Sequence, residues 1–200
     1  TRLVSDWSSD VCSSDLQRKR VKSCGFRRRT VDCSNRISLT MVVPFSQLPD
    51  HSRIWIYPSN RKFSALEITQ LQSDIEQFLS DWTAHGASLS AGYCIPHQQF
   101  IVLALNESDQ QATGCSIDKS VHFIQTLEQS LSVSLLDKMN VHYIKEDVIE
   151  VIDLMSFKKM VKSKHILPSS TVFNHLVTTK LDFINHWETT ADQSWHSRFF

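Results

Sequence analysis

The run from Phe100 to Leu105 consists of six consecutive apolar residues. The segment Pro96-His97-Gln98 precedes it, and residues 88 to 94 form another apolar run before that segment. A strand that is apolar at every position must be buried on both of its faces. The pattern therefore predicts a hairpin of strands 88–94 and 99–105, with the second strand central in its sheet.

Two amphipathic helices are predicted around this hairpin, and each must bury its apolar face against a sheet. In the first, Ser64 and Glu67 form a capping-box pattern, and the helix runs to His85-Gly86, where the glycine can adopt the left-handed conformation that ends a helix. Its apolar positions repeat at helical spacing at Ile68, Leu71, Ile75, Phe78, Leu79 and Trp82. The second begins near Ser116, with Asp118 in its first turn. Its apolar stripe consists of Ile117, Val121, Ile124, Leu127 and Leu131.

The remaining elements are shorter. Strands are predicted at 53–57, 140–145 and 148–152, the last two joined by a turn at Glu146-Asp147. Asp153 can cap a short helix that ends at Val161, and Thr179 with Asp182 can begin another that carries Leu181, Ile184 and Trp187. This order of elements predicts an α+β fold, a mostly antiparallel sheet with helices packed on one face, and a ferredoxin-like core is the leading expectation.

Residues 6 to 16, Asp-Trp-Ser-Ser-Asp-Val-Cys-Ser-Ser-Asp-Leu, match the translation of a common sequencing-library adapter over eleven consecutive codons. We interpret this stretch as adapter contamination and set it aside. Residues 17 to 40 are strongly basic, with Asp32 as their single acid. They are either a disordered basic arm or a translated upstream region in front of a start at Met41, and we favour the second interpretation. The expected organisation is an artefactual or disordered segment, 1–40, and a single α+β domain, 41–200.

Without the first 40 residues the chain has 12 basic and 17 acidic residues, so the predicted domain is mildly acidic. That balance gives no reason to expect nucleic-acid binding. Only Cys94 and Cys115 remain, without a spacing motif, which favours a reducing compartment. No apolar run approaches the ~18 residues of a spanning helix, and no signal-peptide pattern follows Met41. We expect a soluble cytoplasmic protein that does not insert into a membrane.

The most suggestive site pattern lies at the start of the second helix. Free backbone N–H groups there can hold an anion and favour a thiolate. The pattern predicts a ligand site at Gly114, Cys115, Ser116 and Lys119. The alternative is an activated thiol, with Cys115, Asp118 and His122 as catalytic candidates. Against direct proton transfer, His122 is two turns from Cys115, about 10 Å along the helix. The remaining interpretation is a solvated helix face with no site.

Metal and cofactor sites are not predicted. All nine histidines follow Met41, but none forms an HxxxH or HExxH motif or accompanies a CxxC pair. The C-terminus is unusually aromatic, with Trp195, Phe199 and Phe200. We expect these side chains to dock on the domain, and their alternative role is a contact with a protein partner.

Three segments, 112–122, 174–180 and 194–198, resemble a family of short, uncharacterised bacterial proteins commonly labelled "ABC transporter ATPase". The resemblance covers about residues 48 to 200, including Arg53-Ile54-Trp55-Ile56-Tyr57 and Trp82-Thr83-Ala84-His85-Gly86. It implies no particular activity. An ATP-binding cassette requires GxxxxGK[ST], yet no glycine in this sequence is followed by lysine.

Two classes of function therefore stay open. The first, which we favour, is a ligand- or partner-binding accessory protein that is not a P-loop ATPase. The second is a thiol-dependent hydrolase or transferase with Cys115 as the nucleophile.

Overall fold

The computed structural model describes residues 42–84, 87–108 and 110–200. The chain divides near Arg36, and all of these residues belong to the part that begins at Ile37. The adapter-like stretch at 6–16 and the predicted boundary at Met41 lie outside the described residues.

The first sheet contains β1 (Arg53–Pro58), β5 (Phe100–Asn106) and β4 (Ser90–Cys94) in the order β1-β5-β4. Both pairings are antiparallel, and Leu103 of β5 lies opposite Trp55 on one side and Tyr93 on the other. The six residues from Phe100 to Leu105 are completely buried. The predicted hairpin and its central second strand are confirmed. A short 3-10 helix, η2 (Pro96–Gln98), connects the two strands.

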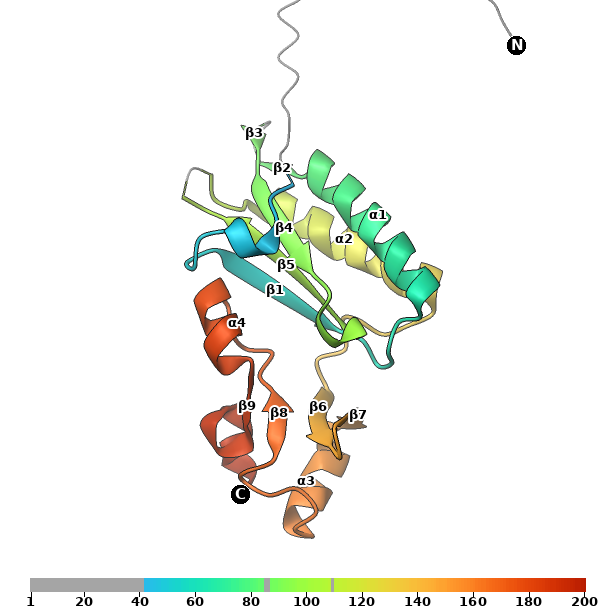
Figure 1. Ribbon diagram of the computed structural model, residues 1–200, viewed down its shortest axis with the longest axis vertical. Coiled ribbons are helices and arrows are strands. Elements are labelled where there is room, and N and C mark those ends of the chain that lie inside the picture. Colours follow the sequence, from blue (N-terminus) through green and yellow to red (C-terminus); the bar gives the residue numbers. More distant parts are fainter. Residues whose placement is uncertain (1–41, 85–86, 109) are drawn as a thin grey trace, which may run out of the picture. The chain divides into compact units, whose positions relative to one another are not determined.

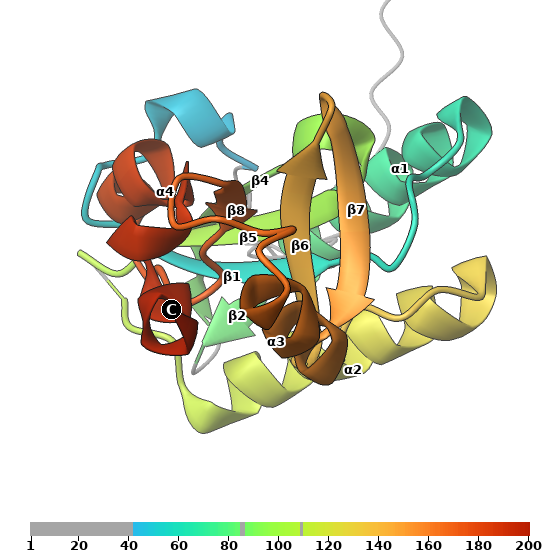
Figure 2. The same cartoon turned by 90° about the horizontal axis from the view of Figure 1, so that it is seen from below.

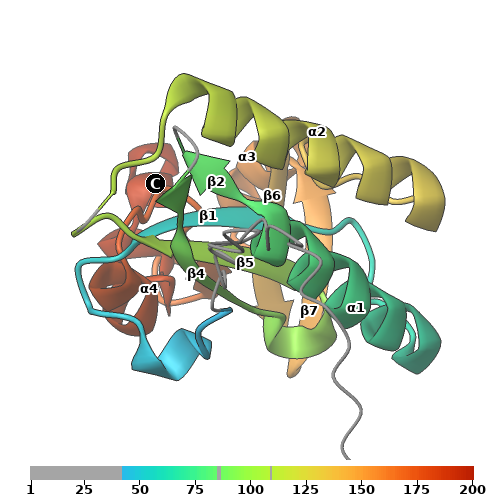
Figure 3. The ribbon, with the colours of Figure 1, turned by 90° about the horizontal axis from the view of Figure 1, so that it is seen from above.

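Helices α1 (Ala65–Asp81) and α2 (Gly114–Leu131) pack on the same face of this sheet (Figures 1 and 3). The capping box predicted for α1 is formed, because Ser64 N donates to Glu67 Oε2 at 2.7 Å and Glu67 N donates to Ser64 Oγ at 3.3 Å. Between helices and sheet lies the largest core cluster, with Leu71, Ile75, Leu79, Trp82, Ile124 and Leu127 from the helical side.

The C-terminal end of α1 and the first residue of α2 differ from the prediction. Helix α1 ends at Asp81, because the Trp82 backbone is extended and its indole Nε1 donates to Ser116 O at 2.8 Å. The chain then forms β2 (Thr83–Ala84), which pairs with β3 (Ala87–Ser88); the predicted glycine end at Gly86 lies outside the described residues. Helix α2 begins at Gly114, not near Ser116, because Thr113 is its N-cap. Asp118 consequently lies beyond the first turn.

The second sheet contains β7 (Val148–Asp153), β6 (Asn140–Lys145), β8 (Thr171–Phe173) and β9 (Glu188–Thr190), in the order β7-β6-β8-β9. All of its pairings are antiparallel. Glu146 and Asp147 form the predicted turn with φ of 49° and 63°, the left-handed geometry of a two-residue hairpin. Asp153 caps α3 (Leu154–Lys162) as predicted, and α3 lies beside β6 and β7 (Figure 2).

A ferredoxin-like core is not shown. The elements from β1 to β6 follow its strand and helix order once the short β2 and β3 are set aside, yet β6 does not pair with the first sheet. It pairs with β7 through the two-residue turn and with β8 on its other edge. The described fold is therefore α+β with two antiparallel sheets, of three and four strands, besides the short β2–β3 pair.

The second face of the first sheet is covered by the C-terminal part of the chain. Helix α4 (Lys180–His186) begins at the predicted cap Thr179, and Phe183 packs near Ile54, Val102 and Ala104. Of the three apolar residues predicted on this helix, Leu181 and Ile184 lie on it and are 49% and 60% exposed, whereas Trp187 follows it as the C-cap. The buried Lys180 Nζ instead donates to Ser46 O at 3.0 Å and to Leu48 O, beside η1 (Phe45–Gln47).

The chain ends in η3 (Ala191–Gln193) and η4 (Trp195–Phe199). Trp195 and Phe199 pack against the core of the second sheet, which confirms the predicted docking for these two of the three aromatic side chains. Phe200 is 47% exposed. Among the described residues, no helix is long and apolar enough to cross a membrane.

Candidate functional site

The site predicted at the start of α2 lies on the surface. Gly114, Cys115, Asp118, Lys119 and His122 are all exposed. Ser116, by contrast, is buried, and its polar groups are used within the helix cap. Its Oγ donates to Thr113 O at 2.9 Å, and its N–H donates to Thr113 Oγ1 at 3.3 Å.

The structure does not pair His122 with Cys115. The Nδ1 atom of His122 lies 3.1 Å from Gln125 Oε1, one turn further along α2. In the described part of the chain, no histidine forms a hydrogen bond with Cys115. The other described cysteine, Cys94, is also a free thiol, and burial raises its pKa to about 12.

A pocket lies elsewhere, where the η2 loop of the first sheet meets the β6–β7 hairpin of the second. Its volume is about 440 Å³, within the range of small-molecule sites. Its lining residues come from three segments distant in sequence: Lys62, Ile95, His97, Gln98, Ile144, Asp147 and Ile149. We call it the junction groove.

Two neighbouring residues that line the junction groove have an unusual backbone conformation. His97 and Gln98 adopt consecutive left-handed conformations, with φ of 53° and 56°. Such conformations cost on the order of 1 kcal/mol or more each for residues other than glycine, so surrounding contacts must hold them. His97 Nε2 lies 3.1 Å from Glu188 Oε2, and its ring centroid lies 5.4 Å from that of Phe173 and 5.8 Å from that of Trp187.

A series of hydrogen bonds, here called the buried polar chain, joins Ser59, Gln99, His142 and His175. The carbonyl oxygen of Ser59 accepts from Gln99 Nε2 at 3.2 Å and from His142 Nε2 at 3.1 Å. Because His142 donates through Nε2, its neutral ring presents Nδ1 as an acceptor. His175 Nε2 lies 3.3 Å from that atom and donates to it. These tautomers are assigned from the hydrogen-bond network.

Three histidines, the buried His142 and His196 and the partly buried His175, have lowered pKa values and are neutral near pH 7. Burial lowers the pKa of His142 and outweighs its hydrogen bond to Ser59. Burial, followed by electrostatic repulsion from the protonated forms of His142 and His196, lowers the pKa of His175 to about 3. His196 has its pKa lowered to about 4, first by burial and then by Arg198. Within the described residues, His175 Nδ1 and Trp187 Nε1 are buried without a hydrogen-bond partner.

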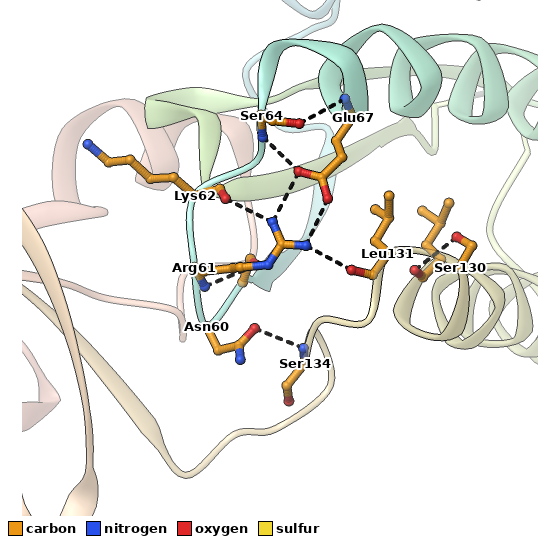
Figure 4. A network of polar contacts seen from close by, with 10 residues as sticks. Asn60, Arg61, Lys62, Ser64, Glu67, Ser130, Leu131 and Ser134 are labelled. Carbon is orange, nitrogen blue, oxygen red and sulfur yellow. Dashed lines mark hydrogen bonds and ion pairs between the residues drawn. The ribbon is translucent and has the colours of Figure 1, made fainter.

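Of the charged groups in or near the groove, Arg61 is part of an ion pair within the described residues, whereas Lys62 and Asp147 are not. Arg61 forms a two-pronged ion pair with Glu67, at 2.8 and 3.0 Å, and also donates to Leu131 O (Figure 4). The hydrogen bonds from Arg61 and then from Ser64 N lower the pKa of Glu67 to about 2. In Figure 4 the Lys62 side chain extends away from this network. In the described part of the chain, Lys62 Nζ and the Asp147 carboxylate form no ion pair.

Within the described part of the chain, no group of three or more His, Cys, Asp or Glu side chains could hold a metal ion.

The sequence did not indicate that His97, His142 and His175 surround one aromatic ring, that of Phe100. Their ring centroids lie 6.2, 5.1 and 5.7 Å from the Phe100 centroid. His175 and His196 lie in segments 174–180 and 194–198, but no motif in the sequence marks either histidine as functional.

Comparisons with protein-family models, with curated proteins and with solved structures found no match. The class that the fold defines is an α+β protein with two antiparallel sheets and a groove at their junction.

Proposed function

We propose that this protein is a ligand-binding accessory protein and that its ligand binds in the junction groove. The observation that carries the proposal is that His97 and Gln98, which line the groove, both have a left-handed backbone conformation. Strained backbone in residues other than glycine gathers at binding sites, where surrounding contacts hold the chain in one conformation. Here the contacts of His97 with Glu188, Phe173 and Trp187 provide that restraint.

The composition of the groove supports the same proposal. Its aliphatic side chains, Ile95, Ile144 and Ile149, are partly buried and provide apolar contact area. Polar and charged groups from Lys62, His97 and Asp147 stand beside them. Small-molecule sites combine apolar contact area with a few polar groups that fix the orientation of the ligand.

A fragment screen by saturation-transfer NMR tests this function, with the full chain and two variants. Ile149→Glu places a charge in the groove and should abolish the binding of apolar fragments. Val148→Glu is the matched control, because Val148 directly precedes Ile149 in β7, is 50% exposed, and does not line the groove. Equal fragment binding by the wild type and the Ile149 variant would refute the groove as the site.

The ligand site at Gly114, Cys115, Ser116 and Lys119, the thiol chemistry of Cys115 and the partner contact through Trp195, Phe199 and Phe200 stay predictions. So does membership of the family labelled "ABC transporter ATPase". The junction groove is preferred over the α2 site because it combines a pocket with restrained backbone, whereas Cys115 is exposed and does not line the groove.

A further inference from the structure

We infer that the ligand of the junction groove is a small aliphatic zwitterion, of amino-acid or dipeptide size, whose carboxylate meets Lys62 and whose ammonium meets Asp147. This inference rests on the proposed function, and it names the chemical class of the ligand.

The apolar part of the groove is aliphatic. Ile144 and Ile149 are directly opposite each other in the β6–β7 ladder, so their side chains share one face of the hairpin. Both are partly buried against the Phe100, Phe173 and Trp187 cluster. Ile95 lines the groove from the η2 side. The three isoleucines offer an aliphatic ligand body dispersion contacts and removal from water.

The groove carries two opposite charges. Two other charged side chains near it have partners, since Arg61 pairs with Glu67 at 2.8 Å and Glu188 lies 3.1 Å from the His97 ring, whereas the exposed Lys145 and Glu146 of the β6–β7 hairpin form no ion pair within the described residues. Lys62 and Asp147 line the same groove with opposite charges, yet they are not within the 4.0 Å of an ion pair. A ligand with one charge of each sign, placed between them, would satisfy both groups and leave no charge of its own unpaired.

The volume of the groove sets an upper limit to the size of the ligand. About 440 Å³ is ample for a branched amino acid or a dipeptide. A ligand that carried only a carboxylate would leave Asp147 near a like charge, and one that carried only an amine would do the same to Lys62. The groove therefore discriminates by charge pattern as well as by apolar contact.

Titration calorimetry with the full chain tests the inference with four probes that share a branched aliphatic body. L-leucine and leucyl-leucine are zwitterions, 4-methylpentanoate lacks the ammonium, and 3-methylbutylamine lacks the carboxylate. We expect at least one zwitterion to bind about tenfold or more tighter than both singly charged probes, because each loses one charge-assisted hydrogen bond.

Two variants test which charged group of the ligand is bound by Lys62 and which by Asp147. Lys62→Met should weaken zwitterion binding about tenfold without changing the affinity for the amine. Asp147→Asn should weaken zwitterion binding similarly without changing the affinity for the carboxylate, and it keeps the turn because asparagine tolerates the left-handed φ of 63°. Lys159→Met and Asp81→Asn are matched exposed controls outside the groove and should leave all four affinities unchanged.

The outcomes separate this inference from the proposed function. If apolar fragments bind in the groove but the zwitterions bind no tighter than the singly charged probes, the groove is a binding site and the inference is wrong. Zwitterion binding that both variants leave unchanged also overturns it. If neither fragments nor any of the four probes bind, the proposed function fails together with the inference.

Discussion

The imidazole Nε2 of His175 lies 3.3 Å from Nδ1 of His142, and this contact continues a buried polar chain that starts at the Ser59 carbonyl. Ser59 directly follows β1 of the first sheet, whereas His142 belongs to β6 of the second. The hydrogen bond of His142 thus joins β6 of the second sheet to the end of β1 in the first. Protonation of either ring would place a charge against the completely buried Phe100 ring.

Stability should therefore decrease as the pH falls from about 6.5 to 5. In the unfolded chain histidine has a pKa near 6.5, whereas folding lowers the pKa of His175 to about 3 and of His196 to about 4, and also lowers that of His142. The unfolded state then binds more protons throughout this window, so acid favours unfolding. Each such histidine contributes a slope of up to ~1.4 kcal/mol per pH unit.

Urea denaturation between pH 7 and pH 5 measures this slope. The lowered carboxyl pKa values of Glu67 and Asp153 act mainly below about pH 5, where these groups take up protons in the unfolded chain, so their effect within the window is small. His175→Gln should reduce the slope, while His186→Gln, at an exposed position, should leave it unchanged. A free energy of unfolding that is constant from pH 7 to pH 5 would show that these rings are not held neutral.

Gly92→Ala should destabilise the protein by about 1 to 3 kcal/mol. A methyl group at Gly92 would collide with the carbonyl oxygen of Val43, because the segment that precedes η1 crosses β4 there and Val43 N donates to Ala91 O at 2.9 Å. Gly114→Ala is the matched control. A methyl group there meets nothing within 4 Å, and alanine favours the helix, so stability should be equal or higher. Equal unfolding midpoints for the Gly92 variant and the wild type would contradict the close approach.

Features that depend on local sequence could be predicted. The caps at Ser64, Asp153 and Thr179 are formed because each hydroxyl or carboxylate accepts from an amide only two or three residues away. The central position of β5 was also predictable, since six buried apolar residues allow few alternatives. Local patterns are sufficient for these elements because their determinants lie within one turn or one strand.

The rest depends on contacts between distant segments. The end of α1 at Asp81 follows from the hydrogen bond of Trp82 Nε1 to Ser116 O, 34 residues away. The partner of β6 and the His142–Ser59 contact, which spans 83 residues, are set by how the second sheet packs. No periodicity in the sequence contains that information, so neither the junction groove nor the contact between His142 and His175 was predicted.

Cys115 should react with iodoacetamide at least about tenfold faster than Cys94 at pH 7.5. Burial raises the pKa of the Cys94 thiol to about 12, which leaves very little thiolate, whereas Cys115 is exposed in the first turn of α2. Peptide mass spectrometry resolves the two sites from the other cysteines of the chain. Equal rates would mean that Cys94 is accessible in solution or that Cys115 is shielded.

The chain should not hydrolyse ATP by a P-loop mechanism. Such a mechanism needs a glycine-rich loop whose N–H groups surround the phosphates, a lysine that follows a glycine, and a hydroxyl with an acid that hold magnesium. None of the four glycines precedes a lysine. At the start of α2, where N–H groups could meet a phosphate, the Ser116 N–H donates to Thr113 Oγ1, and the exposed Asp118 follows two residues later. Its carboxylate would repel a bare triphosphate.

Purified protein should therefore release phosphate from magnesium ATP no faster than the buffer alone. Lys119→Ala is the informative variant, because Lys119 is the exposed cation nearest in sequence to that helix start. Its removal should change neither the background rate nor the unfolding midpoint. ATP turnover by the wild type that disappears in a folded Lys119→Ala variant would overturn this prediction, and it would show that phosphates bind at the start of α2 without the glycine-rich loop of a P-loop enzyme.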